Sequence, residues 1–223
     1  MKALDLFCGA GGATRGLQEA GFHVTGVDMA PQPRYVGDAF HQADAMTFPL
    51  DGYDLIWASP PCQGYSRLRH LPWLKDKQWP LLIEPMRDRL QRSGTAWVIE
   101  NVEGAPLDGI VLCGQMFNLP IYRHRKFESS RFLLQPGHPR HRHVIGRGRM
   151  VNDRRKRARP NAGSCAGSWG QNTQIVTVAG GQFKKAEGVR ALEIDWMTCA
   201  ELAQAIPPAY SRFIGEQLAR SLV

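Results

Sequence analysis

Short hydrophobic runs alternate with helical stretches over the N-terminal half of the chain. The runs that predict strands cover residues 3–7, 23–27, 53–58 and 96–99, and a shorter run ends near Asp44. The spacing typical of amphipathic helices occurs over residues 13–20 and 80–92. Strands and helices in alternation build a parallel sheet that helices cover on both faces. We therefore expect an α/β protein with a mostly parallel, Rossmann-like sheet.

This pattern is lost in the second half of the chain. Arg, His, Gly, Pro and Ser dominate residues 135–185, and the run RRKRARP at 154–160 has neither helical nor strand periodicity. Regular pattern returns only near Ala191, and residues 209–222 predict an amphipathic C-terminal helix. The expected parts are a core over 1–134, a small basic insertion over 135–185, and a segment over 186–223 that returns to the core.

Positive charge is concentrated in one segment. The chain carries a formal charge of +8, with a pI near 9.5. Residues 121–160 hold 13 of the 28 Lys and Arg residues but only two of the 20 acidic ones, so this segment carries +11 and the rest −3. A nearly neutral body with one basic segment indicates a polyanionic partner, most simply nucleic acid. A solvated basic loop without a ligand remains the alternative.

The cysteines and the hydrophobic runs exclude several classes of protein. The chain has five cysteines without a CxxC pair, which argues against a disulfide framework and a zinc ribbon. His138, His141 and His143 with Cys165 match no standard finger spacing, so we assign no metal site. No run reaches the roughly 18 apolar residues of a membrane span, and the N-terminus lacks a signal-peptide pattern. We therefore expect a cytoplasmic protein that does not bind membranes.

A glycine-rich turn, DLFCGAGG at residues 5–12, follows the first predicted strand and opens a helix. Glycine lets a backbone turn sharply and approach a ligand closely, and a helix N-terminus offers free amides. Such turns serve dinucleotide and S-adenosylmethionine sites alike, and some are merely tight turns. The second strand ends in Asp28, where a carboxylate can accept hydrogen bonds from both ribose hydroxyls of an adenosine. Asp44 is either an adenine ligand or an exposed loop residue.

Two further strand ends carry reactive side chains. The run at 53–58 leads into SPPCQGYS, residues 59–66, where two prolines stiffen the backbone in front of Cys62. The run at 96–99 leads into Glu100. Parallel strands bring their carboxyl ends to one edge of a sheet, so we expect Cys62 and Glu100 to share a cleft. An aimed and desolvated thiol is a strong nucleophile, whereas an isolated cysteine is usually a small buried hydrophobe.

Together these motifs resemble those of the DNA (cytosine-5)-methyltransferases. DLFCGAGG resembles that family's cofactor motif, VD at residues 27–28 its ribose motif, SPPCQGYS its PCQ nucleophile motif, and ENV at 100–102 its glutamate motif. YRHR at 122–125 is similar to the two-arginine motif, with Ile121 where the family has glutamine. The resemblance is strong up to about Lys126 and weak from Thr177 onward.

The resemblance implies a class I methyltransferase that transfers a methyl group from S-adenosylmethionine to carbon 5 of a flipped-out cytosine in double-stranded DNA, acting as a monomer. Cys62 would form the covalent adduct with the base. The implied catalytic residues are Cys62, Glu100, Arg123 and Arg125. The implied cofactor-binding residues are Phe7, Cys8, Gly9, Gly11, Gly12, Asp28, Met29, Asp44, Ala45 and Pro60. The expected DNA-binding residues are Gln63, Ser66, Arg67, Arg69, Arg154, Arg155, Lys156 and Arg157.

The chain also departs from the family. Residues 135–185 are short for a target-recognition domain, and AIPPAYSRFIG at 205–215 replaces the family's GNSV motif. Recognition is therefore expected to be short or relaxed. Two alternatives remain open: the same chemistry on RNA cytosine, since the flipped base is identical, and a non-catalytic DNA-binding protein that has kept the fold. A solvated connection is likewise the alternative to a DNA-contacting loop at 63–79.

Overall fold

We describe a computed structural model of the chain, over residues 1–66, 76–141, 175–179 and 183–222. These residues fall into two compact units. Unit 1 comprises residues 1–112, 124–136 and 205–223, and unit 2 comprises 113–123 and 137–204. The three-part division expected from the sequence stays a prediction.

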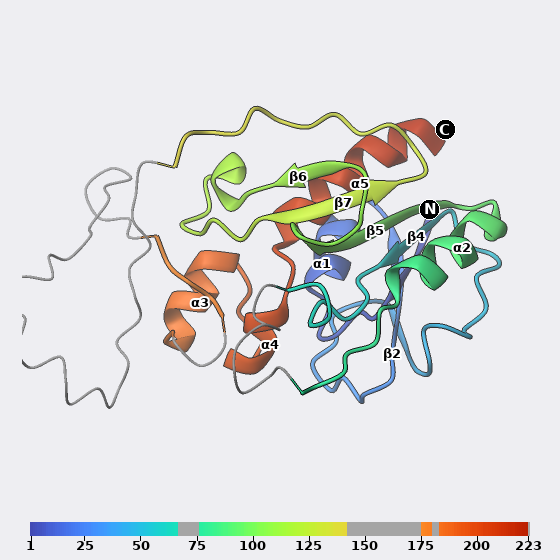
Figure 1. The fold of residues 1–223 in the computed structure, drawn as a ribbon, viewed down its shortest axis with the longest axis horizontal. Coiled ribbons are helices and arrows are strands. Elements are labelled where there is room, and N and C mark those ends of the chain that lie inside the picture. Colours follow the sequence, from blue (N-terminus) through green and yellow to red (C-terminus); the bar gives the residue numbers. More distant parts are fainter. Residues whose placement is uncertain (67–75, 142–174, 180–182, 223) are drawn as a thin grey trace, which may run out of the picture. The chain divides into compact units, whose positions relative to one another are not determined.

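Unit 1 is built on a seven-stranded sheet (Figure 1). Its strands are β1 (Lys2–Leu6), β2 (His23–Asp28), β3 (Ala39–Gln42), β4 (Leu55–Ala58), β5 (Ala96–Val102), β6 (Ile110–Leu112) and β7 (Arg125–Ser129). They lie in the order β3-β2-β1-β4-β5-β7-β6. The first five pair in parallel, whereas β7 runs antiparallel to both β5 and β6. This mixed, mostly parallel sheet confirms the predicted fold class.

Helices cover both faces of this sheet (Figure 1). The helices of unit 1 are α1 (Gly12–Glu19), α2 (Ile83–Ser93) and α5 (Pro208–Leu222). Side chains alternate between the faces of a strand. Leu4 and Leu6 of β1 accordingly belong to one buried cluster with Met86 and Leu90 of α2. Asp5, between them in β1, bonds to Thr14 of α1 on the opposite face.

Helices α1 and α5 pack closely against each other on their face of the sheet. At Gly16 the approach is so close that an added Cβ would lie 2.0 Å from the Pro208 carbonyl oxygen and 2.2 Å from Ser211 Oγ. The C-terminal helix predicted from 209–222 therefore returns to the start of the chain, where α1 follows the glycine-rich turn.

Several element bounds differ from those predicted, for local reasons. Strand β1 ends one residue early because Phe7 takes a left-handed φ of 60°. Strand β5 continues through the ENV motif rather than ending before it, since Glu100 and Val102 pair with β7. Helix α2 begins at Ile83 instead of residue 80, and the Ile83 N–H donates to the Tyr65 hydroxyl at 3.0 Å.

Unit 2 contains elements that the hydrophobic pattern did not reveal. They are the 3-10 helix η2 (Gly114–Phe117) and the helices α3 (Lys185–Leu192) and α4 (Cys199–Gln204). Regular structure returns at Lys185, earlier than the expected position near Ala191. Helix α3 packs on α4 through Gly188, whose added Cβ would lie 3.1 Å from the Leu202 side chain. Residues 142–174 of the basic insertion lie outside the described residues.

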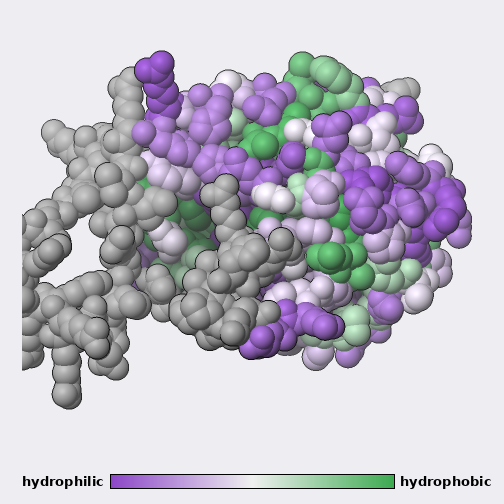
Figure 2. Space-filling view, viewed as in Figure 1, coloured by the Kyte–Doolittle hydropathy of each residue, from purple (hydrophilic) through white to green (hydrophobic). Residues whose placement is uncertain are grey.

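The surface of the described residues shows hydrophobic and hydrophilic side chains interspersed on the face drawn in Figure 2. Exposed large hydrophobic side chains such as Phe132 and Leu134 occur in the described part of the chain. Within the described residues, none of the helices combines the length and the apolar composition that crossing a membrane requires.

Candidate active site

The carboxyl ends of four parallel strands lie level with one another. In the register of the sheet, Val27 of β2 pairs with Leu6 of β1, Leu6 with Ala58 of β4, and Ala58 with Ile99 of β5. The residues that come next along these strands are Asp28, Phe7, Ser59 and Glu100. The strand order reverses between β1 and β4, and ligands of such sheets bind in the crevice at that point. The glycine-rich turn and the Cys62 segment follow the two strands that flank it.

The turn after β1 has the conformation that its glycines allow. Gly9 and Gly11 take left-handed φ values of 50° and 87°, and Gly11 directly precedes α1. The Cys8 N–H donates to the Val27 carbonyl at 3.1 Å, which holds the turn against β2. A Cβ added at Gly9 would meet nothing within 4 Å. The space above this part of the turn is therefore open to a ligand.

Asp28 connects the turn with the end of β2. Its Oδ2 accepts a hydrogen bond from the Gly9 N–H at 3.0 Å, and its Oδ1 accepts one from Ala30 at 2.9 Å. A carboxylate has about four lone-pair sites, so this half-buried group retains the capacity to accept ribose hydroxyls. Met29 beside it is 70% exposed.

Asp44 lies after β3 in an exposed turn rather than within the strand. Its Oδ1 accepts from the Met46 N–H at 2.8 Å, which is the geometry of a loop aspartate that supports its own turn. The neighbouring Ala45 is buried against the cluster of α2. The adenine role expected for Asp44 and the cofactor contact expected for Ala45 stay predictions.

Of the two cysteines at this edge, only Cys62 is in a position to react. Cys8 is 8% exposed, and burial, reinforced by Asp5 and Asp28, raises the pKa of its thiol, so that it stays protonated. Cys62 is only partly buried. Its carbonyl accepts from the Tyr65 and Ser66 N–H groups at 3.1 and 2.9 Å, so the chain turns at Cys62.

Asn101 fixes the proline segment over the neighbouring strand. This side chain is 1% exposed, and its Nδ2 donates to the carbonyl of Pro60 at 2.8 Å. Its Oδ1 accepts from the Val102 N–H, so both ends of the amide are bonded. Sequence reasoning missed this positioning residue, although it is the middle letter of the ENV motif.

Glu100 is buried and paired with an arginine. Its Oε1 lies 3.0 Å from Nε of Arg125, and their side chains are 6% and 16% exposed. Arg125 reaches this position because β7 is antiparallel to β5, so the first residue of β7 meets the last residue, Val102, of β5. Glu100 thus lies against one arginine of the YRHR motif within unit 1, a pairing that the sequence did not predict, and the catalytic roles expected for both residues stay predictions.

The other arginine of the motif belongs to unit 2. Arg123 has a left-handed φ of 32°. Its guanidinium donates to the carbonyls of Val178 and Ala203 at 2.7 and 2.9 Å. In the described residues this side chain therefore binds main-chain carbonyls of its own unit, and the catalytic role expected for it stays a prediction.

Of the predicted DNA-binding residues, Gln63 is exposed and Ser66 is half-buried, close to Cys62 in the chain. The others, Arg67, Arg69, Arg154, Arg155, Lys156 and Arg157, lie outside the described residues. The same holds for His143 and Cys165, which were considered and set aside as metal ligands.

Asp5 is a buried carboxyl that sequence reasoning did not single out, although it is the first letter of DLFCGAGG. It is fully buried, and desolvation raises its pKa to about 7. Its Oδ2 accepts from the Thr14 hydroxyl at 2.6 Å, whereas its buried Oδ1 has no partner among the described residues. Asp28 and Glu100 add like charge nearby and raise the pKa further. The polar site is thus built over a carboxyl that is protonated in part at neutral pH.

Comparisons with known proteins place these features in context. Residues 1–106 match the sequence model of the C-5 cytosine-specific DNA methylase family. No curated protein matches the chain. Among solved structures, a DNA modification methyltransferase encoded within an E. coli prophage is 20% identical, with a TM-score of 0.44, and the match covers 57% of this chain and 45% of that protein. The Dnmt2 methyltransferase of S. pombe is 18% identical, with a TM-score of 0.43, over 60% of this chain and 52% of that one. This chain thus spans about half the length of these proteins.

Proposed function

We propose that this chain transfers a methyl group from S-adenosylmethionine to carbon 5 of cytosine in double-stranded DNA, because its residues 1–106 match the sequence model of the C-5 cytosine-specific DNA methylase family. The observation that carries the proposal is the convergence of a half-buried thiol segment, a buried Glu100–Arg125 pair and a glycine turn with its aspartate at one edge of the sheet. A dehydrogenase that binds a nicotinamide dinucleotide would have no use for a proline-framed cysteine there.

The turn between β1 and α1 fits the adenosine part of the cofactor. The space above Gly9 is open, the turn leads into a helix N-terminus, and the Asp28 carboxylate lies within hydrogen-bonding distance of the turn. Asp28 would accept both ribose hydroxyls, and Met29 would contact the base. S-adenosylmethionine supplies, when bound, an electrophilic methyl group on its sulfonium sulfur.

Cys62 would supply the nucleophile. Carbon 5 of cytosine is a poor nucleophile by itself, and attack of a thiolate on carbon 6 turns it into an enamine carbon that accepts the methyl group. Loss of the carbon 5 proton to a base and elimination of the thiolate then restore the aromatic ring and the enzyme. The bond from Asn101 to the Pro60 carbonyl supports this role, because it holds the chain that leads into Cys62.

Glu100 and Arg125 would hold the target ring. The carboxyl would bond ring nitrogen 3 and the exocyclic amine, and the guanidinium would donate to the carbonyl at position 2. The burial of this pair supports the assignment, since an electrostatic contact is strengthened where water is excluded. The base would have to be flipped out of the duplex, because carbon 6 cannot be reached inside a stacked helix.

The decisive experiment compares two cysteine variants. Tritiated S-adenosylmethionine is incubated with the full chain and duplex DNA of mixed sequence. Cys62→Ser should reduce incorporation by at least about a thousandfold, because a serine hydroxyl without a dedicated base is a far weaker nucleophile. Cys199→Ser, at another partly buried free cysteine, is the matched control and should stay near wild type. Binding of S-adenosylhomocysteine, measured by calorimetry, should be the same in both variants.

Two outcomes would contradict the proposal. Incorporation by Cys62→Ser within tenfold of wild type would exclude covalent catalysis by this residue. Incorporation into transfer RNA but not into duplex DNA would show that the substrate is RNA rather than DNA. DNA that contains 5-fluorocytosine provides an independent test, since the fluorine at carbon 5 cannot leave as a proton and the adduct with Cys62 should accumulate.

A further inference from the structure

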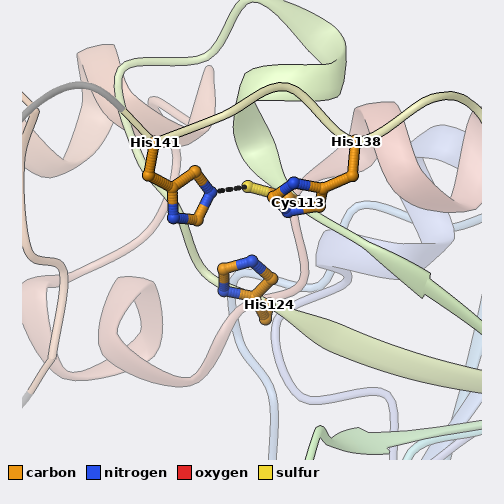
Figure 3. A group of neighbouring side chains, drawn as sticks. All are labelled: Cys113, His124, His138 and His141. Atoms are coloured by element: carbon orange, nitrogen blue, oxygen red, sulfur yellow. Dashed lines mark hydrogen bonds between the residues drawn. The ribbon is translucent and has the colours of Figure 1, made fainter.

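A thiol and two imidazoles of unit 2, which come from two segments far apart in the sequence, lie close together. The thiol of Cys113, which immediately precedes η2, is completely buried. His138 and His141 come from a segment without regular secondary structure, and both are exposed. Figure 3 shows the two imidazoles directed toward the thiol, and one ligand atom from each of the three residues lies within 4.8 Å of the others.

The separation of the thiol and one imidazole is close to that of two ligands on a common metal ion. Cys113 Sγ lies 3.3 Å from Nε2 of His141. In a tetrahedral zinc site with Zn–S near 2.3 Å and Zn–N near 2.0 Å, these atoms are about 3.5 Å apart. The rings of His138 and His141 have centroids 4.8 Å apart, and a ligand atom of His138 lies within 4.8 Å of those of the other two residues.

The surroundings favour a bound ion over simple packing. Among the residues that the structure describes, the buried cluster around the thiol consists of Cys113, Tyr122 and Ile175, with Met116 against it, which is a small core for holding a segment without regular structure. The His141 ring stacks on Tyr122 at a centroid distance of 3.8 Å, and this contact fixes the plane of the imidazole. Metal ions commonly supply the cross-link that such a small core lacks.

We propose that Cys113, His138 and His141 bind a structural zinc ion that ties the segment 113–123 to the start of the basic insertion. Thiolate together with imidazole is a donor set that zinc prefers, whereas calcium and magnesium require oxygen ligands. A fourth ligand completes the tetrahedron.

The loop geometry of unit 2 supports this arrangement. The Gly114 N–H donates to the carbonyl of Tyr122 at 2.8 Å, which brings the two ends of the 113–123 segment side by side. The Val176 N–H donates to the Pro120 carbonyl at 2.8 Å, so residues near the end of the insertion are held by the same segment. A zinc ion would hold residues at the start of the insertion in the same way. Both ends of the basic insertion would then be fixed on one loop, independently of the methyl-transfer site.

The test uses the full chain, without an affinity tag, and measures metal content by mass spectrometry after gel filtration. Wild type should carry one zinc ion per chain. Titration of metal-free protein with cobalt(II) should give the visible bands of a tetrahedral site and a sulfur-to-cobalt charge-transfer band in the near ultraviolet. Cys113→Ser should remove the charge-transfer band, because that band requires a thiolate ligand.

The histidine variants keep the test independent of the buried cysteine. His138→Gln and His141→Gln change exposed side chains, and each should weaken cobalt binding by at least about a hundredfold, since loss of an outer-shell partner alone costs ten- to a hundredfold. His23→Gln, at an exposed histidine of β2, and Cys199→Ser are matched controls and should bind as wild type does. Zinc below a tenth of an ion per chain with no cobalt band in wild type would overturn the proposal. A charge-transfer band that persists in Cys113→Ser would overturn it too.

Discussion

The buried carboxyl of Asp5 should make the stability of unit 1 depend on pH in a way that one substitution removes. Its pKa is about 7 in the folded protein, against 3.8 for a solvated aspartate. A group whose pKa is raised by folding holds its proton more tightly in the folded state. The stabilisation of the folded state that results is complete at pH values below the pKa of the group in the unfolded chain. It is lost as the pH rises through the pKa of the group in the folded protein.

The size of the effect follows from the two pKa values. A pKa difference of one corresponds to about 1.4 kcal/mol, so full ionisation of Asp5 costs on the order of 4 kcal/mol in the folded state. Most of this change falls between pH 5 and pH 8. Over that range, the free energy of unfolding of wild type should fall by about 2–3 kcal/mol because of this one carboxyl. The main cause is desolvation, which outweighs the hydrogen bonds that Thr14 donates to this carboxyl, and Oδ1 has no partner in the described part of the chain.

Asp5→Asn retains the shape of the side chain but cannot ionise. Its amide nitrogen replaces an oxygen that has no partner in the described structure, so a constant penalty of about 1–3 kcal/mol is expected at every pH. The free energy of unfolding is measured by urea denaturation with tryptophan fluorescence at pH 5 and pH 8, for wild type, Asp5→Asn and the exposed control Asp51→Asn. The fall from pH 5 to pH 8 should be about 2–3 kcal/mol smaller in Asp5→Asn than in the other two proteins. Equal falls in all three would show that Asp5 does not carry a raised pKa.

Three further predictions concern the packing and the site. Arg125→Met should destabilise the fold by about 3–5 kcal/mol because it leaves the Glu100 carboxylate buried without its partner, and adding Glu100→Gln should restore most of that loss in a double-mutant cycle. Gly16→Ala should cost about 2–3 kcal/mol in urea denaturation because its Cβ would collide with the Pro208 carbonyl, whereas Gly137→Ala, where a Cβ meets nothing within 4 Å, should be neutral. Asp28→Ala should weaken binding of S-adenosylhomocysteine by about 1.5–3 kcal/mol in titration calorimetry, and an unchanged dissociation constant would place the adenosine elsewhere.

The sequence alone was enough to predict which strand ends carry the candidate site residues. Hydrophobic periodicity is a local signal, and the motifs DLFCGAGG, SPPCQGYS and ENV each follow a run that periodicity predicts. Parallel strands necessarily present their carboxyl ends at one edge, so the alternation of elements was enough to bring Asp28, Cys62 and Glu100 to the same side of the sheet. Glycine permits backbone conformations that other residues avoid, and proline fixes φ. The turns that contain these residues could therefore be predicted from the residue type alone.

Only the tertiary structure decided which distant residues meet. The pairing of Glu100 with Arg125 depends on β7 entering the sheet antiparallel, and the register of two strands is a long-range property that neither sequence segment encodes by itself. The burial of Asp5 depends on α1 covering its face of the sheet, so its raised pKa has no local signal. Cys113 likewise meets His138 and His141 across more than twenty intervening residues, and such a long-range contact has no signal in either sequence segment by itself.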